Sequence, residues 1–290
     1  IYNYRSLRTA LQSRGHQFTS QGDAEVIAHL YEEQGEACFA QLNGMFAIAI
    51  WDDNQKKLVL ARDRLGQKPL FYCQQPGRLL FASELKSLHA VPGLETPVSS
   101  HAVDLYLTYQ YVPHPHCILE GFNKLSPGFL AVYQQDQLRL QQYWQLPADR
   151  EQVIGEAEAA ERLVELLDSS VQLRMQSDVP LGAFLSGGID SSLIVALMQR
   201  HSSSPVSTFS IGFPVAEYDE TAYARQVAKH LGTEHHEFRV EPDAVEILPQ
   251  LAFHFDEPLA DSSAIPTWYV ARETRKQVTV ALSGDGADEL

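Results

Sequence analysis

Two glycine-containing loops place hydroxyl and carboxylate side chains directly after apolar segments. The first loop, SGGIDSS, spans residues 186–192 and follows VPLGAFL, and the second, SGDGADE, spans residues 283–289 and follows QVTVAL. Paired glycines let the backbone turn sharply and bring its N–H groups close to a ligand. A helix that begins at such a turn points the positive end of its dipole at the same place. The first loop therefore predicts an anion site, and phosphate is the simplest occupant.

The chemistry of this anion site depends on the residue beside the glycines. The common phosphate-binding loop, GxxxxGK[ST], supplies a lysine, whereas this loop has Asp190 instead. A carboxylate beside a polyphosphate is useful chiefly as a ligand for a divalent metal, because like charges otherwise repel. We therefore predict that Asp190 and an acid of the second loop, Asp285, Asp288 or Glu289, share Mg²⁺ on a nucleotide pyrophosphate. The alternative is an ordinary strand, turn and helix with Asp190 as the helix cap.

The second half of the chain has a pattern that would bring the two loops together. Beyond about residue 150, strand-like segments such as VSTFSIGF alternate with helical segments such as YDETAYARQVAKHLG. This alternation predicts βαβ units and a parallel sheet. Ligands of such sheets bind beyond the carboxyl ends of the strands, so both loops are expected to line one crevice.

The first half has the pattern of an antiparallel sheet with flanking helices. Residues 44–63 and 68–84 each read as two strands joined by a polar turn, and residues 23–35 have helical spacing. Asp23 is the expected N-cap of that helix. We therefore predict an α+β domain over residues 1–145 and a parallel α/β domain over residues 146–290.

Composition excludes several classes of function. The chain has 22 basic and 37 acidic residues, a net charge of −15, which disfavours a general nucleic-acid binder. Its apolar runs are shorter than the roughly 20 residues that cross a bilayer, so a membrane partner is not expected. Cys38, Cys73 and Cys117 lack metal-ligand spacing and read as buried free thiols. Together these features predict a cytoplasmic location.

The longer motifs resemble those of the glutamine-hydrolysing asparagine synthetase family. SGGIDSS is similar to the pyrophosphate loop of N-type ATP pyrophosphatases, and VPLGAFLSGGIDSS with SGDGADEL is similar to the family's synthetase domain. LNGMFAIAIWD, ARDRLGQKPLFY and FASELKSL are similar to its glutaminase domain, and YVPHPHCILEGFNKLSPG to its connecting segment. The resemblance covers essentially the whole chain.

This resemblance implies a fold, a reaction and its substrates. The fold would be a partial αββα glutaminase-type domain, mainly antiparallel, followed by a partial ATP-pyrophosphatase domain with a parallel sheet. Aspartate would react with ATP to give β-aspartyl-AMP and pyrophosphate, and ammonia from glutamine would then displace AMP. The implied small molecules are aspartate, glutamine and ATP with Mg²⁺, and the family is compatible with a homodimer.

The resemblance also implies roles for individual residues. Leu185 and Ile211 would line the adenine site, Ser283 and Gly284 would complete the nucleotide pocket, and Asp285 would take part in forming the acyl-adenylate. Asp23 would bind the α-amino group of glutamine, and Asp190 and Asp288 would hold the metal. The residues that would cradle the pyrophosphate are Ser186, Gly187, Gly188, Asp190 and Ser191.

Several alternatives remain at the level of the sequence. Asp261, Ser262 and Ser263 read equally well as a helix start and as contacts to the acid substrate. Arg62, Asp63 and Arg64 read as structural ion pairs at a sheet edge. A related amidotransferase or β-lactam synthetase acting on another acid, and a non-catalytic nucleotide-binding protein, are the competing functions.

The family comparison also predicts what this chain lacks. The nucleophilic N-terminal cysteine of the glutaminase, its arginine partner and the oxyanion asparagine are expected upstream of Ile1, and a catalytic lysine is expected downstream of Leu290. We therefore expect the chain by itself to hydrolyse no glutamine.

Overall fold

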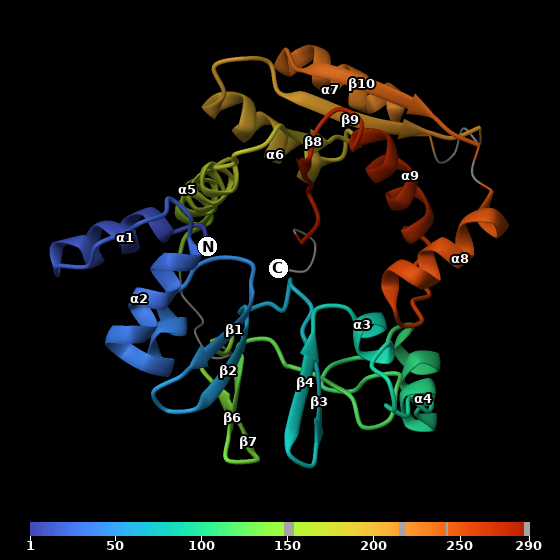
Figure 1. The fold of residues 1–290 in the computed structure, drawn as a ribbon. Coiled ribbons are helices and arrows are strands. Elements are labelled where there is room, and N and C mark those ends of the chain that lie inside the picture. The colour runs from blue at the N-terminus through green and yellow to red at the C-terminus, as the bar shows by residue number, and fades with distance from the viewer. Residues whose placement is uncertain (148–153, 215–218, 242, 287–290) are drawn as a thin grey trace. The chain divides into compact units, whose positions relative to one another are not determined.

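The computed structural model describes residues 1–147, 154–214, 219–241 and 243–286, which form two compact units. The first unit comprises residues up to 150 together with residues 252–260, and the second comprises residues 151–251 and 261–290. Figure 1 shows antiparallel strands in the first unit and parallel strands with crossing helices in the second. The predicted combination of an antiparallel and a parallel sheet is confirmed.

The first unit contains two antiparallel sheets, ordered β1-β2-β6-β7 and β4-β3-β5. The strands of the larger sheet are β1 (Ala47–Asp52), β2 (Lys57–Arg62), β6 (Phe129–Gln134) and β7 (Gln137–Gln142). Those of the smaller sheet are β3 (Phe71–Gln75), β4 (Arg78–Ala82) and β5 (Asn123–Lys124). The helical segments are α1 (Tyr4–Ser13), α2 (Ala24–Gln34), the 3-10 helix η1 (Gly35–Gln41), α3 (Leu85–His89) and α4 (Ser100–Tyr109).

The hairpins form where the sequence predicts them, because turn residues separate short strands. In the first hairpin Asp52 pairs with Lys57, and in the second Gln75 pairs with Arg78 across Pro76 and Gly77. Gly77 has a φ of +74°, a left-handed conformation that costs glycine little.

The central strands of the larger sheet, β2 and β6, are buried on both faces. Side chains alternate along a strand, so Val59 and Ala61 of β2 pack with Leu11 and Leu30 of the helices. Leu60, which lies between them, packs on the opposite face with Tyr72 of β3. The sheet therefore lies between helices α1 and α2 on one side and the smaller sheet on the other.

The second unit has a four-stranded parallel sheet, ordered β10-β9-β8-β11. Its strands are β8 (Leu181–Phe184), β9 (Ser207–Gly212), β10 (Glu234–Arg239) and β11 (Val280–Leu282). Its helices are α5 (Glu156–Arg174), α6 (Ile189–His201), α7 (Thr221–Leu231), α8 (Ala244–Phe255) and α9 (Ala264–Thr274), and the last turn of α8 packs with the first unit. Among the described residues, no helix combines the length and the apolarity that a membrane crossing requires.

Candidate functional site

The ends of three neighbouring strands open into one cavity in the second unit. β8 is hydrogen-bonded to β9 on one side and to β11 on the other, and all three run in the same direction. Their carboxyl ends lead into a cavity of about 600 Å³. Its lining includes Leu185, Ser186, Gly188, Asp190, Ser191, Ile211, Ser283, Gly284, Asp285 and Gly286. The structure thus brings together nearly all of the residues that the sequence assigned to nucleotide binding.

The first loop is arranged as a turn of hydroxyl and amide groups. The Oγ atoms of Ser186 and Ser191 are 2.9 Å apart, and the amide of Gly188 donates to Ser186 Oγ at 3.2 Å. Gly188 is the N-cap of α6, so the first N–H groups of this 13-residue helix have no carbonyl one turn earlier to bond. The amides therefore lie where the sequence predicts an anion to bind, and this binding stays a prediction.

Gly187 is required by both its conformation and its surroundings. Its φ is +88°, and a Cβ atom built there would lie 2.6 Å from the amide nitrogen of Ala224 in α7. A larger residue would therefore be strained and would meet backbone that cannot move aside. Gly187 shapes the loop, whereas its neighbours Ser186 and Gly188 line the cavity.

The second loop lies directly on the first. A Cβ atom on Gly284 would lie 2.7 Å from the amide nitrogen of Ser191 and 3.1 Å from Cβ of Asp190. This close approach explains why a glycine follows Ser283 in the second loop. The Ser283 hydroxyl donates to Oδ2 of Asp285 at 2.9 Å and so fixes that carboxylate at the rim of the cavity.

Asp190 does not cap the helix, contrary to the alternative drawn from the sequence. The cap position belongs to Gly188, and Asp190 lies in the first turn of α6. Its side chain is therefore available to the cavity that it lines. Asp288 and Glu289, the other predicted acids, lie outside the described residues.

The donors in the cavity suit a divalent cation held together with phosphate. The carboxylates of Asp190, Asp285 and Glu220 line it, with hydroxyl groups among them. Mg²⁺ prefers oxygen ligands and is usually held by one or two carboxylates plus substrate phosphates and water. The residues present therefore fit Mg²⁺ bound with a nucleotide.

Several lining residues were not singled out from the sequence. Glu220 precedes α7, and Thr267 and Val270 belong to α9. Glu220 follows a parallel strand, so the rule that ligands bind beyond strand ends would have found it. Thr267 and Val270 lie within a helix, and only the packing of α9 beside the sheet brings them to the cavity.

Asp261, Ser262 and Ser263 lie at a helix start, as one of the two alternatives predicted. α9 begins at Ala264, and the Ser263 amide donates to Oδ1 of Asp261 at 2.8 Å. Hydrogen bonding by the Ser263 side chain and by this amide lowers the pKa of Asp261. Their contact with an acid substrate stays a prediction.

Asp23 lies at the N-cap position of α2, but its side chain does not cap the helix. Its Oδ2 instead lies 2.5 Å from the main-chain nitrogen of Ile1. Both residues line a second cavity of about 380 Å³, together with Ile27, Met45, Phe46, Ala47, Ile48, Lys68, Pro69 and Ser83. The Asp23 carboxylate is thus placed beside this cavity. Its contact with the α-amino group of glutamine stays a prediction.

The segment from Arg62 to Arg64 is structural, although hydrogen bonds to the backbone take the place of the predicted ion pairs. The Arg62 guanidinium donates to the carbonyls of Lys68, Leu125 and Gly66. Asp63 is 1% exposed and accepts from four amides, those of Phe46, Leu65, Gln67 and Lys68. Arg64 donates to the carbonyl of Ala40.

The three cysteines are free and buried, as predicted. Burial raises the pKa of Cys38 and of Cys117 to about 12, and it also raises the pKa of Cys73. A thiol with so high a pKa is a poor nucleophile at neutral pH.

Comparison with known proteins matches both units. The family model described as glutamine amidotransferase domain matches residues 1–144, and the one described as asparagine synthase matches residues 162–290. The whole chain is 38% identical to glutamine-hydrolysing asparagine synthetase 1 of Bacillus subtilis, covering 46% of it. It is also 38% identical to putative asparagine synthetase 2 of Methanocaldococcus jannaschii, covering 56%, and 32% identical to asparagine synthetase 2 of Arabidopsis thaliana, covering 47%. The chain therefore spans about half the length of these curated relatives.

Proposed function

The chain belongs to the glutamine-hydrolysing asparagine synthetase family, and on that premise we propose that it forms the ATP-binding part of an enzyme that makes asparagine from aspartate. Glutamine would be the nitrogen donor. The observation that carries the proposal is the contact between the two loops, where Gly284 leaves no space for a Cβ atom against Asp190 and Ser191. This contact places two sets of hydroxyl, amide and carboxylate groups around one cavity.

The proposed reaction has two steps. A β-carboxylate oxygen of aspartate attacks the α-phosphorus of ATP, and the bond from that phosphorus to the pyrophosphate oxygen breaks. Ammonia then attacks the β-carbonyl carbon of aspartyl-AMP, loses a proton, and AMP leaves with the electron pair of the broken C–O bond. The loop lacks the lysine that assists γ-phosphoryl transfer, which is consistent with reaction at the α-phosphate.

The residues of the first loop would bind the pyrophosphate. The amides at the start of α6 would donate to its oxygens, and the hydroxyls of Ser186 and Ser191, already 2.9 Å apart, would orient it. Leu185 and Ile211, which line the same cavity, would contact the adenine.

Mg²⁺ would supply positive charge against the phosphates, with Asp190 as its ligand and Asp288 as the second predicted one. Asp285 would face the aspartate and the α-phosphate during adenylation. The hydrogen bond from Ser283 keeps its carboxylate in one orientation, so that this role costs little reorganisation.

The first unit would bind glutamine. Asp23, which lines the second cavity, would accept hydrogen bonds from the α-ammonium group of the substrate. The named relatives are asparagine synthetases, which supports aspartate over other acids as the acceptor.

Pyrophosphate release tests this function in the protein that contains this chain. ATP, Mg²⁺ and ammonia would be supplied with aspartate or with other carboxylic acids, and release is expected to depend on aspartate. Loss of a residue that only supports a metal ligand from outside typically lowers activity by roughly 10–100-fold. Asp190 is proposed to bind the metal directly, so Asp190→Ala is expected to lower the rate by more than that. Asp178→Ala, at an exposed residue of the same unit, is the matched control and should leave the rate unchanged.

Two results would contradict the proposal. Unchanged synthesis in Asp190→Ala would show that the metal and pyrophosphate assignment is wrong. Release that responds to another acid but not to aspartate would keep the nucleotide site and remove asparagine as the product.

A further inference from the structure

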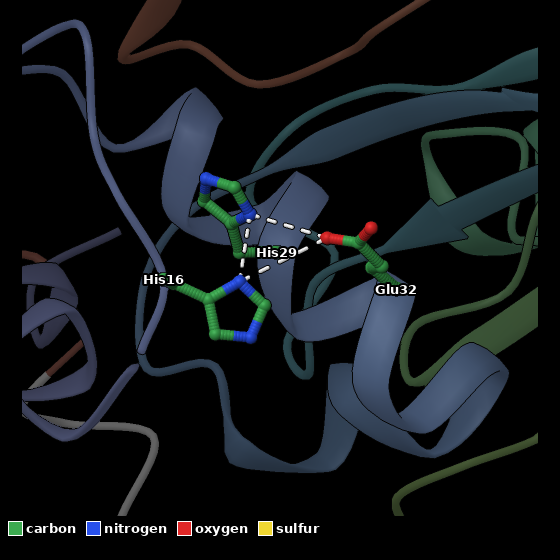
Figure 2. A group of neighbouring side chains, drawn as sticks. All are labelled: His16, His29 and Glu32. Atoms are coloured by element: carbon green, nitrogen blue, oxygen red, sulfur yellow. Dashed lines mark hydrogen bonds and ion pairs between the residues drawn. The ribbon is translucent and has the colours of Figure 1, made fainter. Parts of the chain in front are cut away.

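A second group of side chains with metal-binding chemistry lies in the first unit. His29 and Glu32 lie one turn apart on α2, and His16 lies between α1 and α2, as Figure 2 shows. The Nδ1 atoms of His16 and His29 are 3.0 Å apart. Oε2 of Glu32 is 3.3 Å from Nδ1 of His29 and 3.8 Å from Nδ1 of His16. Three potential ligand atoms thus converge within 4.8 Å of one another.

The hydrogen position on His16 follows from its second neighbour. Nε2 of His16 is 2.8 Å from Oε1 of Glu33. An ionised carboxylate can only accept, so Nε2 carries the hydrogen and a neutral ring has a bare lone pair on Nδ1. That lone pair faces His29 and Glu32. A histidine held by a carboxylate in this way is the usual arrangement of a metal ligand and its outer support.

In its neutral form, His29 is incompletely satisfied without an ion. Its Nδ1 must then carry the hydrogen of the neutral ring, because His16 Nδ1 and Glu32 can only accept. This leaves Nε2 bare, and that atom is buried with no hydrogen-bond partner among the described residues. Oε1 of Glu25 lies 3.9 Å from it, so two acceptors face each other.

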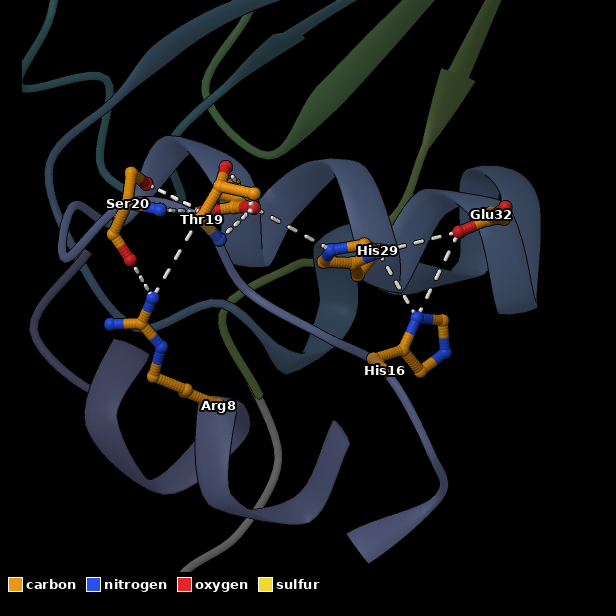
Figure 3. A network of polar contacts seen from close by, with 7 residues as sticks. Arg8, His16, Thr19, Ser20, His29 and Glu32 are labelled. Carbon is orange, nitrogen blue, oxygen red and sulfur yellow. Dashed lines mark hydrogen bonds and ion pairs between the residues drawn. The ribbon is translucent and has the colours of Figure 1, made fainter. Parts of the chain in front are cut away.

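Hydrogen bonds hold the Glu25 carboxylate in this position. The amides of Thr19 and Ser20 donate to it at 2.8 and 2.7 Å, and the Ser20 hydroxyl donates to it at 2.6 Å. Figure 3 shows how this network continues to His29, Glu32 and His16. A hydrogen on Nε2 of His29 would interact favourably with the Glu25 carboxylate. In the neutral ring, this arrangement requires the hydrogen to leave Nδ1.

We propose that His16, His29 and Glu32 bind a divalent transition-metal ion such as Zn²⁺ through two Nδ1 atoms and one carboxylate oxygen. The ion takes the place of the hydrogen on Nδ1 of His29, and the ring hydrogen moves to Nε2. Imidazole and carboxylate are ordinary Zn²⁺ ligands at about 2.0–2.2 Å, which places neighbouring ligand atoms roughly 3.0–3.5 Å apart. Water completes the coordination.

The surrounding charges and exposure suit a cation. Three carboxylates, Glu25, Glu32 and Glu33, face the two imidazoles. Arg8 and Arg14 pair with Glu25 and Glu33 at 4.0 Å and 3.2 Å, which leaves one negative charge in excess. The side chain of Glu32 is 69% exposed, so its carboxylate can turn toward an ion that arrives from solvent.

The bound ion would join two segments of the first unit. His16 belongs to the connection after α1, whereas His29 and Glu32 belong to α2, whose N-terminal neighbour is Asp23. The ion would therefore fasten the connection to the helix that Asp23 precedes. This site is independent of the nucleotide cavity and of the proposed reaction.

Metal titration of the chain tests the proposal. One equivalent of Zn²⁺, or of Co²⁺ with its visible absorption, is expected to bind and to raise the thermal unfolding midpoint. His16→Gln and Glu32→Gln should each lose this binding and the midpoint shift, and Glu32, being exposed, can be replaced without disturbing the fold. Glu33→Gln keeps the three ligands and should weaken binding by about 10–100-fold.

A matched control and two outcomes decide the result. His230→Gln removes an exposed histidine of the second unit and should bind Zn²⁺ like the unchanged chain. Equal Zn²⁺ affinity of the unchanged chain, His16→Gln and Glu32→Gln would overturn the proposal. Displacement of Zn²⁺ by equimolar Mg²⁺ would also overturn it, because Mg²⁺ does not favour imidazole ligands.

Discussion

Gly284 is the residue on which the contact between the two nucleotide loops depends. A methyl group there would lie 2.7 Å from the amide nitrogen of Ser191, and this backbone belongs to the start of α6. We expect Gly284→Ala to push the loops apart by several tenths of an ångström or more. Misplacement of about 1 Å can cost roughly a hundredfold in rate, and we expect a loss of that order in aspartate-dependent pyrophosphate release.

The control for this substitution is another glycine of the same unit. Gly155 precedes α5, has a negative φ, and has nothing within 4 Å of a built Cβ atom. Gly155→Ala should therefore leave pyrophosphate release unchanged. Full activity in Gly284→Ala would show that the two loops do not act as one site.

Individual residues differed in how far the sequence could predict their positions. The sequence could predict the positions of Ser186, Asp190 and Ser283, because ligands of a parallel sheet bind beyond the carboxyl ends of its strands, where these residues lie. Asp23 was predicted to cap a helix, yet its carboxylate lies 2.5 Å from the main-chain nitrogen of Ile1, which is 22 residues away in sequence. Local pattern gives the helix boundary, whereas a long-range partner decides what the side chain does.

The positions of the strands and helices along the sequence were largely predictable, but which elements lie side by side in the fold was not. Alternating polarity indicates hairpins at residues 44–63 and 68–84, and the alternation of strands and helices indicates a parallel sheet. The sequence does not state that β8 lies between β9 and β11, and this order creates the cavity. It also does not state that α9 supplies Thr267 and Val270.

Asp63 holds together the turn that follows β2. Its buried carboxylate accepts hydrogen bonds from Phe46, Leu65, Gln67 and Lys68, at 2.9 to 3.2 Å. Asp63→Asn replaces one acceptor oxygen with a donor that faces other donors. Because hydrogen bonds to charged groups are worth about 1.5–3 kcal/mol each, we expect the free energy of unfolding to fall by roughly 2–4 kcal/mol.

Chemical denaturation measures this effect, and an exposed aspartate provides the comparison. Asp53, at the turn between β1 and β2, is 77% exposed, and Asp53→Asn should leave the unfolding midpoint essentially unchanged. If both substitutions have equally small effects, the four amides find other acceptors and Asp63 is not the residue that fixes the turn.

The two compact units do not follow a single division of the sequence. Residues 252–260 follow β10 and most of α8, yet they pack in the first unit. Asp256 pairs with Lys86 at 3.0 Å and accepts the amide hydrogen of Leu85, while Glu257 pairs with Lys124. The hydrophobic periodicity and the composition of the sequence do not reveal that residues 252–260 pack in the first unit, because this packing rests on ion pairs between residues more than 130 positions apart.

Glu257 should control access to a thiol in the first half of the sequence. Its side chain is 10% exposed, pairs with Lys124, and accepts the amide hydrogen of Ile118, which adjoins Cys117. Glu257→Gln leaves Lys124, whose side chain is 14% exposed, without its charge partner, a change that costs about 3 kcal/mol for a largely buried pair. If the free energy of local opening around Cys117 falls by this amount, alkylation of Cys117 should accelerate by roughly a hundredfold.

Cys38 is the internal reference for that measurement. It lies in a different hydrophobic cluster, with Phe39 and Leu42, and burial raises its pKa to about 12, as for Cys117. Its alkylation should be much less affected in Glu257→Gln, and neither thiol should accelerate in Glu246→Gln, where the replaced residue is exposed. Equal acceleration of both thiols would mean that the first unit opens as a whole. An unchanged rate at Cys117 would mean that residues 252–260 are not needed to keep this part of the unit closed.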